Sequence, residues 1–146
     1  MARMLLQEAS PEVYKGFIDI ALLIRKGPLD PSVQELIKIR ASQLNGCAFC
    51  VDVHTRDARK LGEPEERMYH LTIWRESHLY SEPERAALAY TEAVTRREPV
   101  SDELWETLRK HFPDERELGD LVALVSLINA LNLFGVPLKL RPPVRD

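Results

Sequence analysis

Helix start and stop signals recur along the whole sequence, and they constrain the possible folds more than any other feature. Ser10-Pro11 and Asp30-Pro31 are typical helix starts, and Asn45-Gly46 is a typical stop. The apolar–polar alternation that strands show is nearly absent. The predicted helices span about 11–27, 31–44, 47–61, a short segment after Pro64, 85–95 behind a capping box at Ser81, 101–110, and 114–133. We therefore predict an all-α fold, a compact bundle of about seven helices, in a single domain over residues 1–146.

Composition and charge narrow the class of protein. The 146 residues are 45% hydrophobic and 29% charged, which suffices for a hydrophobic core without metals or several disulfides. The net charge is −3 and both signs are mixed along the chain, so we expect no nucleic-acid partner. The N-terminal residues become polar too early for a signal peptide. We expect a cytoplasmic protein whose partner is a small molecule or another protein.

The most apolar segment, residues 121–138, raises the question of a membrane span. Ser126, Asn129 and Asn132 interrupt it, and a glycine and a proline close it, whereas a spanning helix needs about 20 mostly apolar residues. We interpret the segment as a central buried helix and expect no membrane contact. Because its apolar residues lie on nearly every side, they need cover from the domain or from a partner chain. We therefore hypothesise that the protein forms a homo-oligomer, in which a partner chain covers part of this helix.

The two cysteines of the chain, Cys47 and Cys50, lie three positions apart. A secreted disulfide scaffold usually has more cysteines, spread along the chain, so this spacing indicates redox or metal chemistry. On a helical wheel both cysteines and His54 fall on one apolar stripe, and most charged residues of the predicted helix 47–61 fall on the other side. We therefore expect the two thiols and the imidazole to point into the interior together.

This placement predicts reactive thiol chemistry. Cys47 would stand in the first helical turn, where free backbone N–H groups and the helix dipole favour a thiolate, so we expect a lowered pKa. His54 lies four residues after Cys50, within reach to exchange a proton with its thiol. Cysteines at this spacing in a helix have Cα atoms about 5–6 Å apart, which permits a disulfide. One helix would then supply a nucleophile, a resolving thiol and a base.

Residues outside this helix are interpreted as structural from their positions. In the predicted helix 31–44, Arg40 falls within the apolar stripe, which suggests a buried ion pair. Glu35 falls on the opposite side of the helical wheel, which predicts a charge exposed to solvent. Trp74 and Trp105 are interpreted as packing residues. The other histidines show no metal-ligand spacing with the cysteines; they are His70, His78 and His111.

The segment from Glu35 to His54 carries a family resemblance. It consists of a glutamate, eleven residues, the pair Cys47-Ala48-Phe49-Cys50, three residues and a histidine. This pattern resembles the core of the alkylhydroperoxidase AhpD-like proteins, which belong to the carboxymuconolactone decarboxylase superfamily. The strong match covers roughly residues 31–62. The resemblance implies an all-helical fold that assembles as trimers or hexamers, and an oxidoreductase that reduces hydroperoxides with thiols.

The resemblance also implies a role for each matched residue. Cys50 would be the peroxidatic thiol, Cys47 the resolving thiol, His54 the proton acceptor for Cys50, and Glu35 the group that orients and charge-balances His54. An external dithiol would reduce the resulting disulfide, without a bound cofactor or metal. The founding alkylhydroperoxidase has a second histidine where this sequence has Phe49. Phe49 either lines a substrate pocket or a subunit contact, or it is an exposed aromatic residue.

Three other functions remain compatible with the sequence. Cys47, Cys50, His54 and Glu35 could supply four ligands to zinc, although three ligands on one helix converge on the ion from one side. A decarboxylase or another lyase, as in the branch that names the superfamily, would not depend on the dithiol. A redox sensor or an oligomeric scaffold would form the disulfide without turnover.

Overall fold

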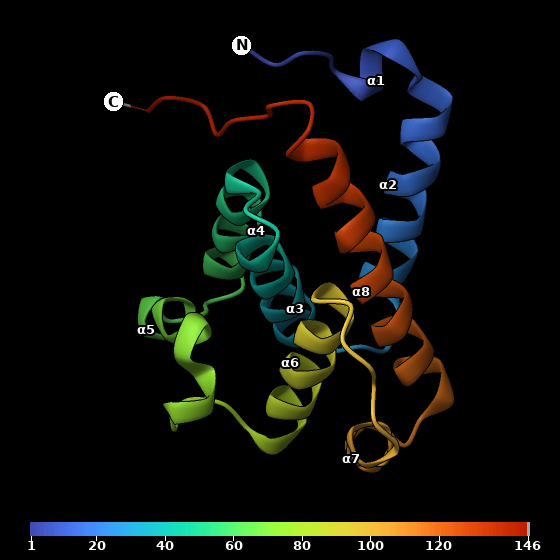
Figure 1. Ribbon diagram of the computed structural model, residues 1–146, viewed down its shortest axis with the longest axis vertical. Coiled ribbons are helices and arrows are strands. Elements are labelled where there is room, and N and C mark those ends of the chain that lie inside the picture. The colour runs from blue at the N-terminus through green and yellow to red at the C-terminus, as the bar shows by residue number, and fades with distance from the viewer. Residues whose placement is uncertain (146) are drawn as a thin grey trace.

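The computed structural model describes residues 1–145 and contains helices without any strand in that range. The elements are α1 (Leu6–Ala9), α2 (Pro11–Lys26), α3 (Pro31–Leu44), α4 (Ala48–Lys60), α5 (Glu65–Tyr69), the 3-10 helix η1 (His70–Glu76), α6 (Glu82–Thr95), α7 (Asp102–His111) and α8 (Glu115–Gly135) (Figure 1). The predicted all-α fold is confirmed. The sequence pattern does not predict α1 and η1, because each is too short to show a helical period and, unlike α5 after Pro64, begins without a proline or a side-chain cap.

The helix caps follow the signals in the sequence. Asp30 accepts hydrogen bonds from two backbone N–H groups in the first turn of α3, at 2.8 and 3.2 Å. Asp114 accepts one at the start of α8, at 2.8 Å, and Ser81 begins a complete capping box in front of α6. Ser10 precedes α2 as predicted, but its side chain makes no cap hydrogen bond. The start of α2 therefore relies on proline in its first turn.

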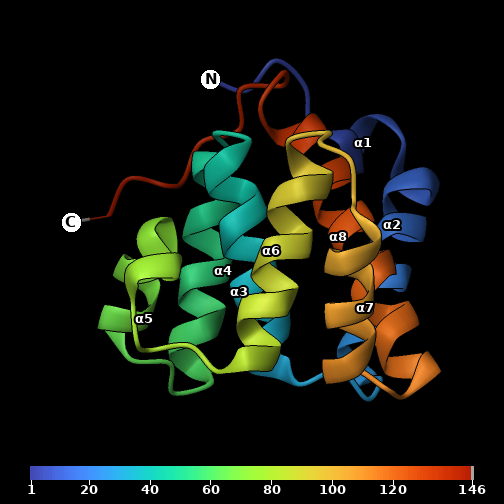
Figure 2. The same ribbon diagram turned by 60° about the horizontal axis from the view of Figure 1, so that its bottom comes forward.

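Helix α3 is the centre of the bundle, packed against α4, α6 and α8 (Figure 2). Ile37 and Ala41 belong to a hydrophobic cluster that continues into α6, α7 and α8. Leu36 and Ile39 belong to a second cluster, which α4, α5, η1 and α6 complete. All four side chains are fully buried. Because neighbours cover α3 on several sides, this helix has no single apolar stripe that decides which residues are inside.

Helix α8 is the predicted long apolar helix, and it runs to Gly135. Leu121, Val125 and Ile128 are buried in the core. Leu133 is 60% exposed, so the rest of the chain up to residue 145 covers α8 on part of its circumference only. By length and composition alone α8 could span a membrane. Its packing against α2, α3 and α6 is what the core helix of a folded domain shows.

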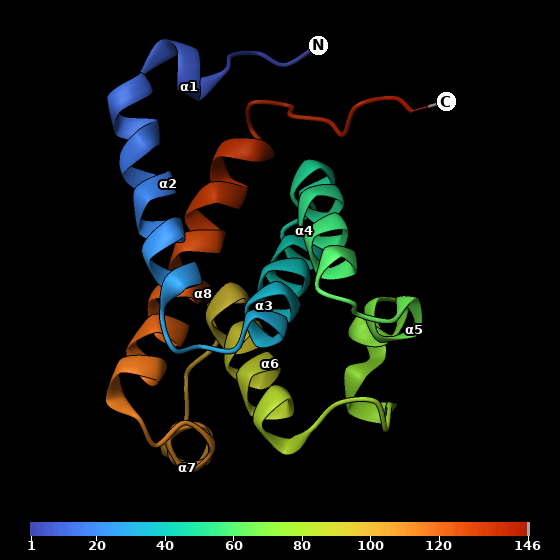
Figure 3. The ribbon, with the colours of Figure 1, turned by 180° about the vertical axis from the view of Figure 1, so that it is seen from behind.

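Helix α2 lies along the outer side of α8 (Figure 3). Ile24 is its one fully buried residue, and Val13, Ile20 and Leu23 remain exposed. These exposed apolar residues recur at helical spacing, with intervals that keep them on one side of the helix. The exposed surface of α2 thus includes apolar side chains that nothing within residues 1–145 covers.

The N-terminal and C-terminal segments meet at one end of the molecule, near the beginning of α4 (Figure 1). The backbone N–H of Arg3 donates to the carbonyl of Leu138, at 2.8 Å. Arg145 forms a bidentate ion pair with Asp52 of α4, and both N–O distances are 2.6 Å. These contacts hold both segments beside the helix that carries the cysteines.

Candidate active site

Cys47 and Cys50 form a disulfide at the beginning of α4, with their Cα atoms 5.3 Å apart. The spacing predicted from the sequence is therefore confirmed. Cys47 is the N-cap residue of α4, and its Sγ accepts a hydrogen bond from the backbone N–H of Cys50, at 3.3 Å. Both residues are buried, with 2% of Cys47 and 7% of Cys50 exposed. A negative charge on Cys47 would face the positive end of the helix dipole.

A tight turn between α3 and α4 fixes the position of the disulfide. Asn45 caps the end of α3, and Gly46 has φ of +69°, a left-handed conformation that glycine adopts at little cost. The Asn45 side chain donates to the side-chain oxygens of Asn129 and Asn132 in α8, both at 2.9 Å. Two of the polar residues that interrupt the apolar segment therefore anchor the turn in front of the dithiol.

Glu35 lies beside His54, where α3 and α4 pack together. Glu35 Oε2 is 3.3 Å from His54 Nδ1, and neither atom has a well-aligned hydrogen-bond partner within residues 1–145. Glu35 Oε1 accepts a hydrogen bond from Lys38 Nζ, at 2.5 Å. Glu35 is 4% exposed, so the solvated position that the helical wheel predicts for it is wrong. The wheel fails because α4 covers the side of α3 that carries this glutamate.

The surroundings of Glu35 keep its carboxyl group ionised. Burial by itself would raise the pKa of Glu35, because a charged carboxylate loses hydration. Pairing with His54 and with the ammonium group of Lys38 outweighs this effect, so that the pKa lies below its ordinary value. Glu35 therefore presents an ionised carboxylate to Nδ1 of the His54 ring, where it can orient the imidazole.

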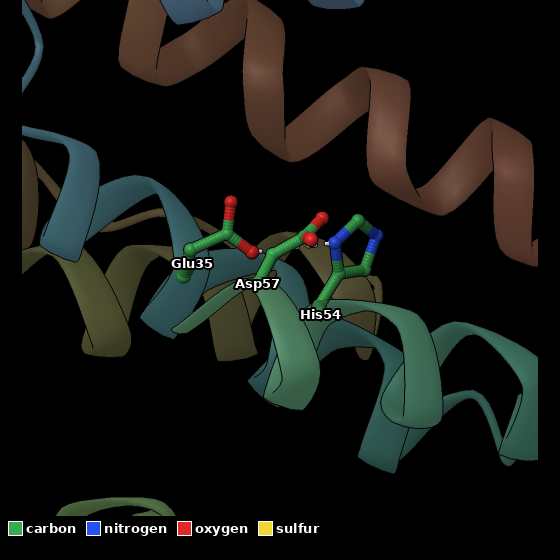
Figure 4. Close-up of side chains that lie close together, drawn as sticks. All are labelled: Glu35, His54 and Asp57. Carbon is green, nitrogen blue, oxygen red and sulfur yellow. Dashed lines mark ion pairs between the residues drawn. The ribbon is translucent and has the colours of Figure 1, made fainter. Parts of the chain in front are cut away.

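Asp57 of α4 completes a small group of ligand-type side chains with Glu35 and His54 (Figure 4). One ligand atom from each of the three residues lies within 4.8 Å of the others. A lysine already balances each carboxylate, because Lys38 binds Glu35 at 2.5 Å and Lys60 binds Asp57 at 3.1 Å. These two ammonium groups oppose a divalent cation electrostatically. The ligand set also differs from the zinc alternative, in which both cysteines take part.

A cavity of about 420 Å³ opens beside Cys50. Helix α4 contributes Phe49, Cys50, Val53 and His54 to its wall, and Cys47 does not reach it. The other walls come from α2, α8 and the N-terminal and C-terminal segments, through Tyr14, Ile18, Ile128, Leu131, Phe134, Leu138 and their neighbours. Phe49 thus lies in a pocket wall, which is one of the positions that the sequence leaves open for it. The cavity gives a small molecule access to Cys50 and His54 together.

Gly135 closes the cavity wall at the disulfide. A methyl carbon placed on Gly135 would lie 2.7 Å from Cys47 Sγ and 3.4 Å from Cys50 Sγ, and the first distance is too short for any side chain. Sequence reasoning does not find this residue, because a glycine at the end of an apolar helix looks like a stop signal. Its proximity to the sulfur atoms becomes visible only when α4 and α8 are placed together.

The buried ion pair predicted for Arg40 is present, and it lies away from the dithiol. Arg40 Nε binds Glu92 Oε1 at 2.9 Å, and Trp74 Nε1 donates to the same oxygen at 2.9 Å. Arg75 binds the second oxygen of Glu92, at 2.5 Å. This network joins α3, η1 and α6. It confirms Arg40 and Trp74 as structural residues.

Comparison with known proteins places these features in a family. The family model described as carboxymuconolactone decarboxylase family matches residues 11–93. The chain is 43% identical to the uncharacterized protein YdfG of Bacillus subtilis over 131 residues, which cover 88% of each chain. The sequence relationship thus includes the turn, the two cysteines and the glutamate–histidine pair.

Solved structures show the same fold. The chain is 35% identical to a protein of unknown function from Agrobacterium tumefaciens that has been suggested to be the antioxidant defence protein AhpD; the match covers 99% of this chain and 100% of that one, with a TM-score of 0.93. An alkylhydroperoxidase AhpD core from Ralstonia eutropha, described as an uncharacterized peroxidase-related protein, is 21% identical, with coverage of 95% and 75% and a TM-score of 0.81. The second likeness concerns the fold alone.

Proposed function

The chain belongs to the carboxymuconolactone decarboxylase family, with an AhpD-like fold, and from this premise we propose that it is a thiol-dependent peroxidase. One observation carries the proposal. Cys50 can form a disulfide with Cys47, and it shares a cavity wall with His54, whose imidazole contacts the buried carboxylate of Glu35. A nucleophile, a resolving thiol and a proton carrier thus surround one accessible site.

The oxidative half of the cycle begins with reduced cysteines. His54 takes the proton of the Cys50 thiol, and the thiolate attacks one oxygen of a hydroperoxide ROOH. The O–O bond breaks, the other oxygen leaves with the proton from His54 as the alcohol ROH, and Cys50 becomes a sulfenic acid. The Cys47 thiol then attacks this sulfur, an S–S bond forms, and the hydroxyl group leaves with the thiol proton as water. Two thiols supply the two electrons that the hydroperoxide accepts.

The reductive half needs an external dithiol. Its thiolate attacks Cys50 Sγ from the cavity, and Cys47 leaves as a thiolate. The helix N-terminus stabilises this leaving group, since the backbone N–H of Cys50 points at Cys47 Sγ. The second thiol of the reductant then displaces Cys50, so that both cysteines return to the reduced state and the reductant carries the new disulfide.

The location and assembly of the protein are part of the same proposal. A cytoplasmic location would supply dithiol reductants. Assembly as a trimer or a hexamer would cover the exposed apolar residues of α2. The proposed assembly rests on the family resemblance and on these exposed residues.

Steady-state consumption of cumene hydroperoxide, with dithiothreitol as reductant, tests the function. We expect turnover in the wild type and none in Cys50→Ser. In Cys47→Ser, Cys50 should react once with the hydroperoxide, but no disulfide can form and the cycle should stop there. His54→Ala should slow the reaction about a hundredfold, which is typical of a lost general base. Ala48→Ser is the matched control, because it adds a serine beside Cys47 and keeps both thiols.

Three outcomes would contradict the peroxidase proposal. Equal rates in the wild type, Cys50→Ser and His54→Ala would show that the consumption of hydroperoxide does not use this site. Decarboxylation of a carboxymuconolactone that persists in the double variant Cys47→Ser/Cys50→Ser would favour the lyase alternative. A disulfide that forms once and never cycles with any dithiol would favour a sensor.

A further inference from the structure

We infer that the cavity beside Cys50 binds hydroperoxides of long-chain carboxylic acids, with the apolar chain inside the cavity and the carboxylate held at its mouth by Lys139 and Arg141. This inference rests on the proposed function and names the substrate class of the same site. It follows from three properties of the cavity: its apolar walls, its cations and the depth at which each lies.

The walls between the reactive centre and the mouth are apolar. Aliphatic and aromatic side chains from three directions line them, including Ile18 of α2, Leu131 and Phe134 of α8, and Leu140 of the C-terminal segment. A volume of about 420 Å³ is within the range of sites that enclose small organic ligands. Hydrogen peroxide or another small peroxide would leave most of this apolar surface uncovered. An extended hydrocarbon chain would displace water from it, which is favourable.

The charged residues on the cavity wall are all cationic within the part of the chain that the structure describes. Lys139 and Arg141 line the cavity, and no aspartate or glutamate does. Neither cation forms an ion pair with a carboxylate among residues 1–145, and Arg141 donates only to the carbonyl of Leu140, at 3.2 Å. Two cations without a protein carboxylate beside an apolar cavity complement an anionic head group on an apolar ligand.

Backbone hydrogen bonds fix the conformation of the chain at Lys139 and Leu140. Lys139 has φ of +57°, a left-handed conformation that is uncommon for a residue with a side chain. The N–H of Lys139 donates to the carbonyl of Val136 at 3.1 Å, and the N–H of Leu140 donates to the carbonyl of Gly135 at 2.9 Å. The segment with the cations is thus tied to the residue that contacts the disulfide.

Burial separates the two ends of the cavity. Cys50 and Gly135 are buried at its base, whereas Lys139 and Arg141 are exposed, which places them at its opening. A substrate whose peroxide group reaches Cys50 while its carboxylate reaches the cations must carry an apolar chain between the two groups. A fatty-acid hydroperoxide has this arrangement of groups.

The test compares linoleic acid hydroperoxide with its methyl ester, which keeps the chain and loses the charge. We expect kcat/KM for the acid to exceed that for the ester about fivefold at low salt, because exposed ion pairs contribute modestly, and the preference should shrink as salt rises. In Lys139→Gln/Arg141→Gln the preference should fall to about one. The matched control Arg109→Gln/Lys110→Gln removes the same charge from α7, at the opposite end of the molecule, and should keep the preference.

A binding measurement keeps this inference separate from the peroxidase proposal. Calorimetric titration with linoleic acid, which has no peroxide group, should show binding that weakens in Lys139→Gln/Arg141→Gln and persists in the α7 control. Binding without any hydroperoxide turnover would contradict the peroxidase proposal and support the site. Turnover with equal rates for acid and ester, or an acid preference that survives loss of both cations, would overturn the inference.

Discussion

Gly135 leaves room for the disulfide by having no side chain. A methyl carbon at this position would overlap Cys47 Sγ at 2.7 Å, so alanine requires the disulfide or the end of α8 to move. Gly119 lies in the same helix, and a methyl carbon there would meet no atom within 4 Å. The two glycines therefore differ in what they contact, although both belong to α8.

We expect Gly135→Ala to lower the free energy of unfolding by about 2 kcal/mol, as overpacking does, and to slow disulfide formation after one equivalent of hydroperoxide. Gly119→Ala should raise the free energy of unfolding by about 0.5–1 kcal/mol, because alanine is the better helix former. Urea denaturation and stopped-flow fluorescence measure the two effects. Wild-type stability and kinetics in Gly135→Ala would show that the sulfur atoms are not packed against this residue.

Glu35 acts on the reaction through His54. We expect Glu35→Gln to slow oxidation of Cys50 at neutral pH about tenfold or more, because the His54 imidazole loses the carboxylate that orients it and that balances its charge when it accepts the proton of Cys50. The dependence of the rate on pH should change as well, which a loss of packing alone would not cause. An unchanged pH–rate profile in a folded variant would remove Glu35 from the mechanism. Lys15→Gln, which alters an exposed ion pair on α2, serves as the control.

At the scale of helices, Glu92 is the polar group that joins α6 to its neighbours. Burial by itself would raise its pKa, but hydrogen bonds from Arg75, Trp74 and Arg40 lower it below the ordinary value. We expect Glu92→Gln to reduce the free energy of unfolding by about 3 kcal/mol near neutral pH, because Arg40 is left buried without its carboxylate. Chemical denaturation of both proteins measures the difference.

The same difference should depend on pH in one direction. The pKa of Glu92 is lower in the folded protein, so its stabilisation is present above the ordinary glutamate pKa of about 4.3 and is lost as the pH falls through the folded-state value. The stability gap between the wild type and Glu92→Gln should therefore be constant near neutral pH and narrow in acid. A gap that widens in acid would contradict the assigned shift.

Sequence signals predict most helices but not how each helix is covered. Pro11, Asp30 and Ser81 mark helix starts because they act locally on the first turn. The helical wheel predicts the burial of both cysteines correctly. It fails for Glu35, because a wheel assumes one apolar stripe and α3 packs against α4, α6, α8 and η1. The contact between Glu35 and His54 depends on how α3 and α4 pack, and the sequence indicates it only through the family pattern.

At the scale of the whole molecule, the exposed apolar side of α2 predicts self-association. Leu23 is 66% exposed, and a cluster of such residues usually marks an interface. We expect the wild type to sediment as a homo-oligomer and Leu23→Glu to shift it toward monomer without loss of helix content. Analytical ultracentrifugation and circular dichroism measure these properties. A monomeric wild type at micromolar concentration would refute the homo-oligomer.

The cavity is a property of the whole molecule, and sequence patterns do not predict it. Its walls come from residues near both ends of the chain and from α2, α4 and α8. The contact between Arg3 and Leu138 joins positions that are 135 residues apart in the sequence, so no local signal indicates it. The cysteine pair could be predicted because both cysteines lie at the start of one helix. The residues that form the cavity wall could be identified only from the tertiary structure.

The most direct test of the mechanism is a single turnover of reduced Cys47→Ser with one equivalent of cumene hydroperoxide in the presence of dimedone. The account predicts one dimedone adduct, located by peptide mass spectrometry on Cys50, while the wild type under the same conditions forms the Cys47–Cys50 disulfide. Absence of the adduct from Cys50, or an equally fast adduct on Cys47 in Cys50→Ser, would contradict the assignment of Cys50 as the thiol that attacks the hydroperoxide.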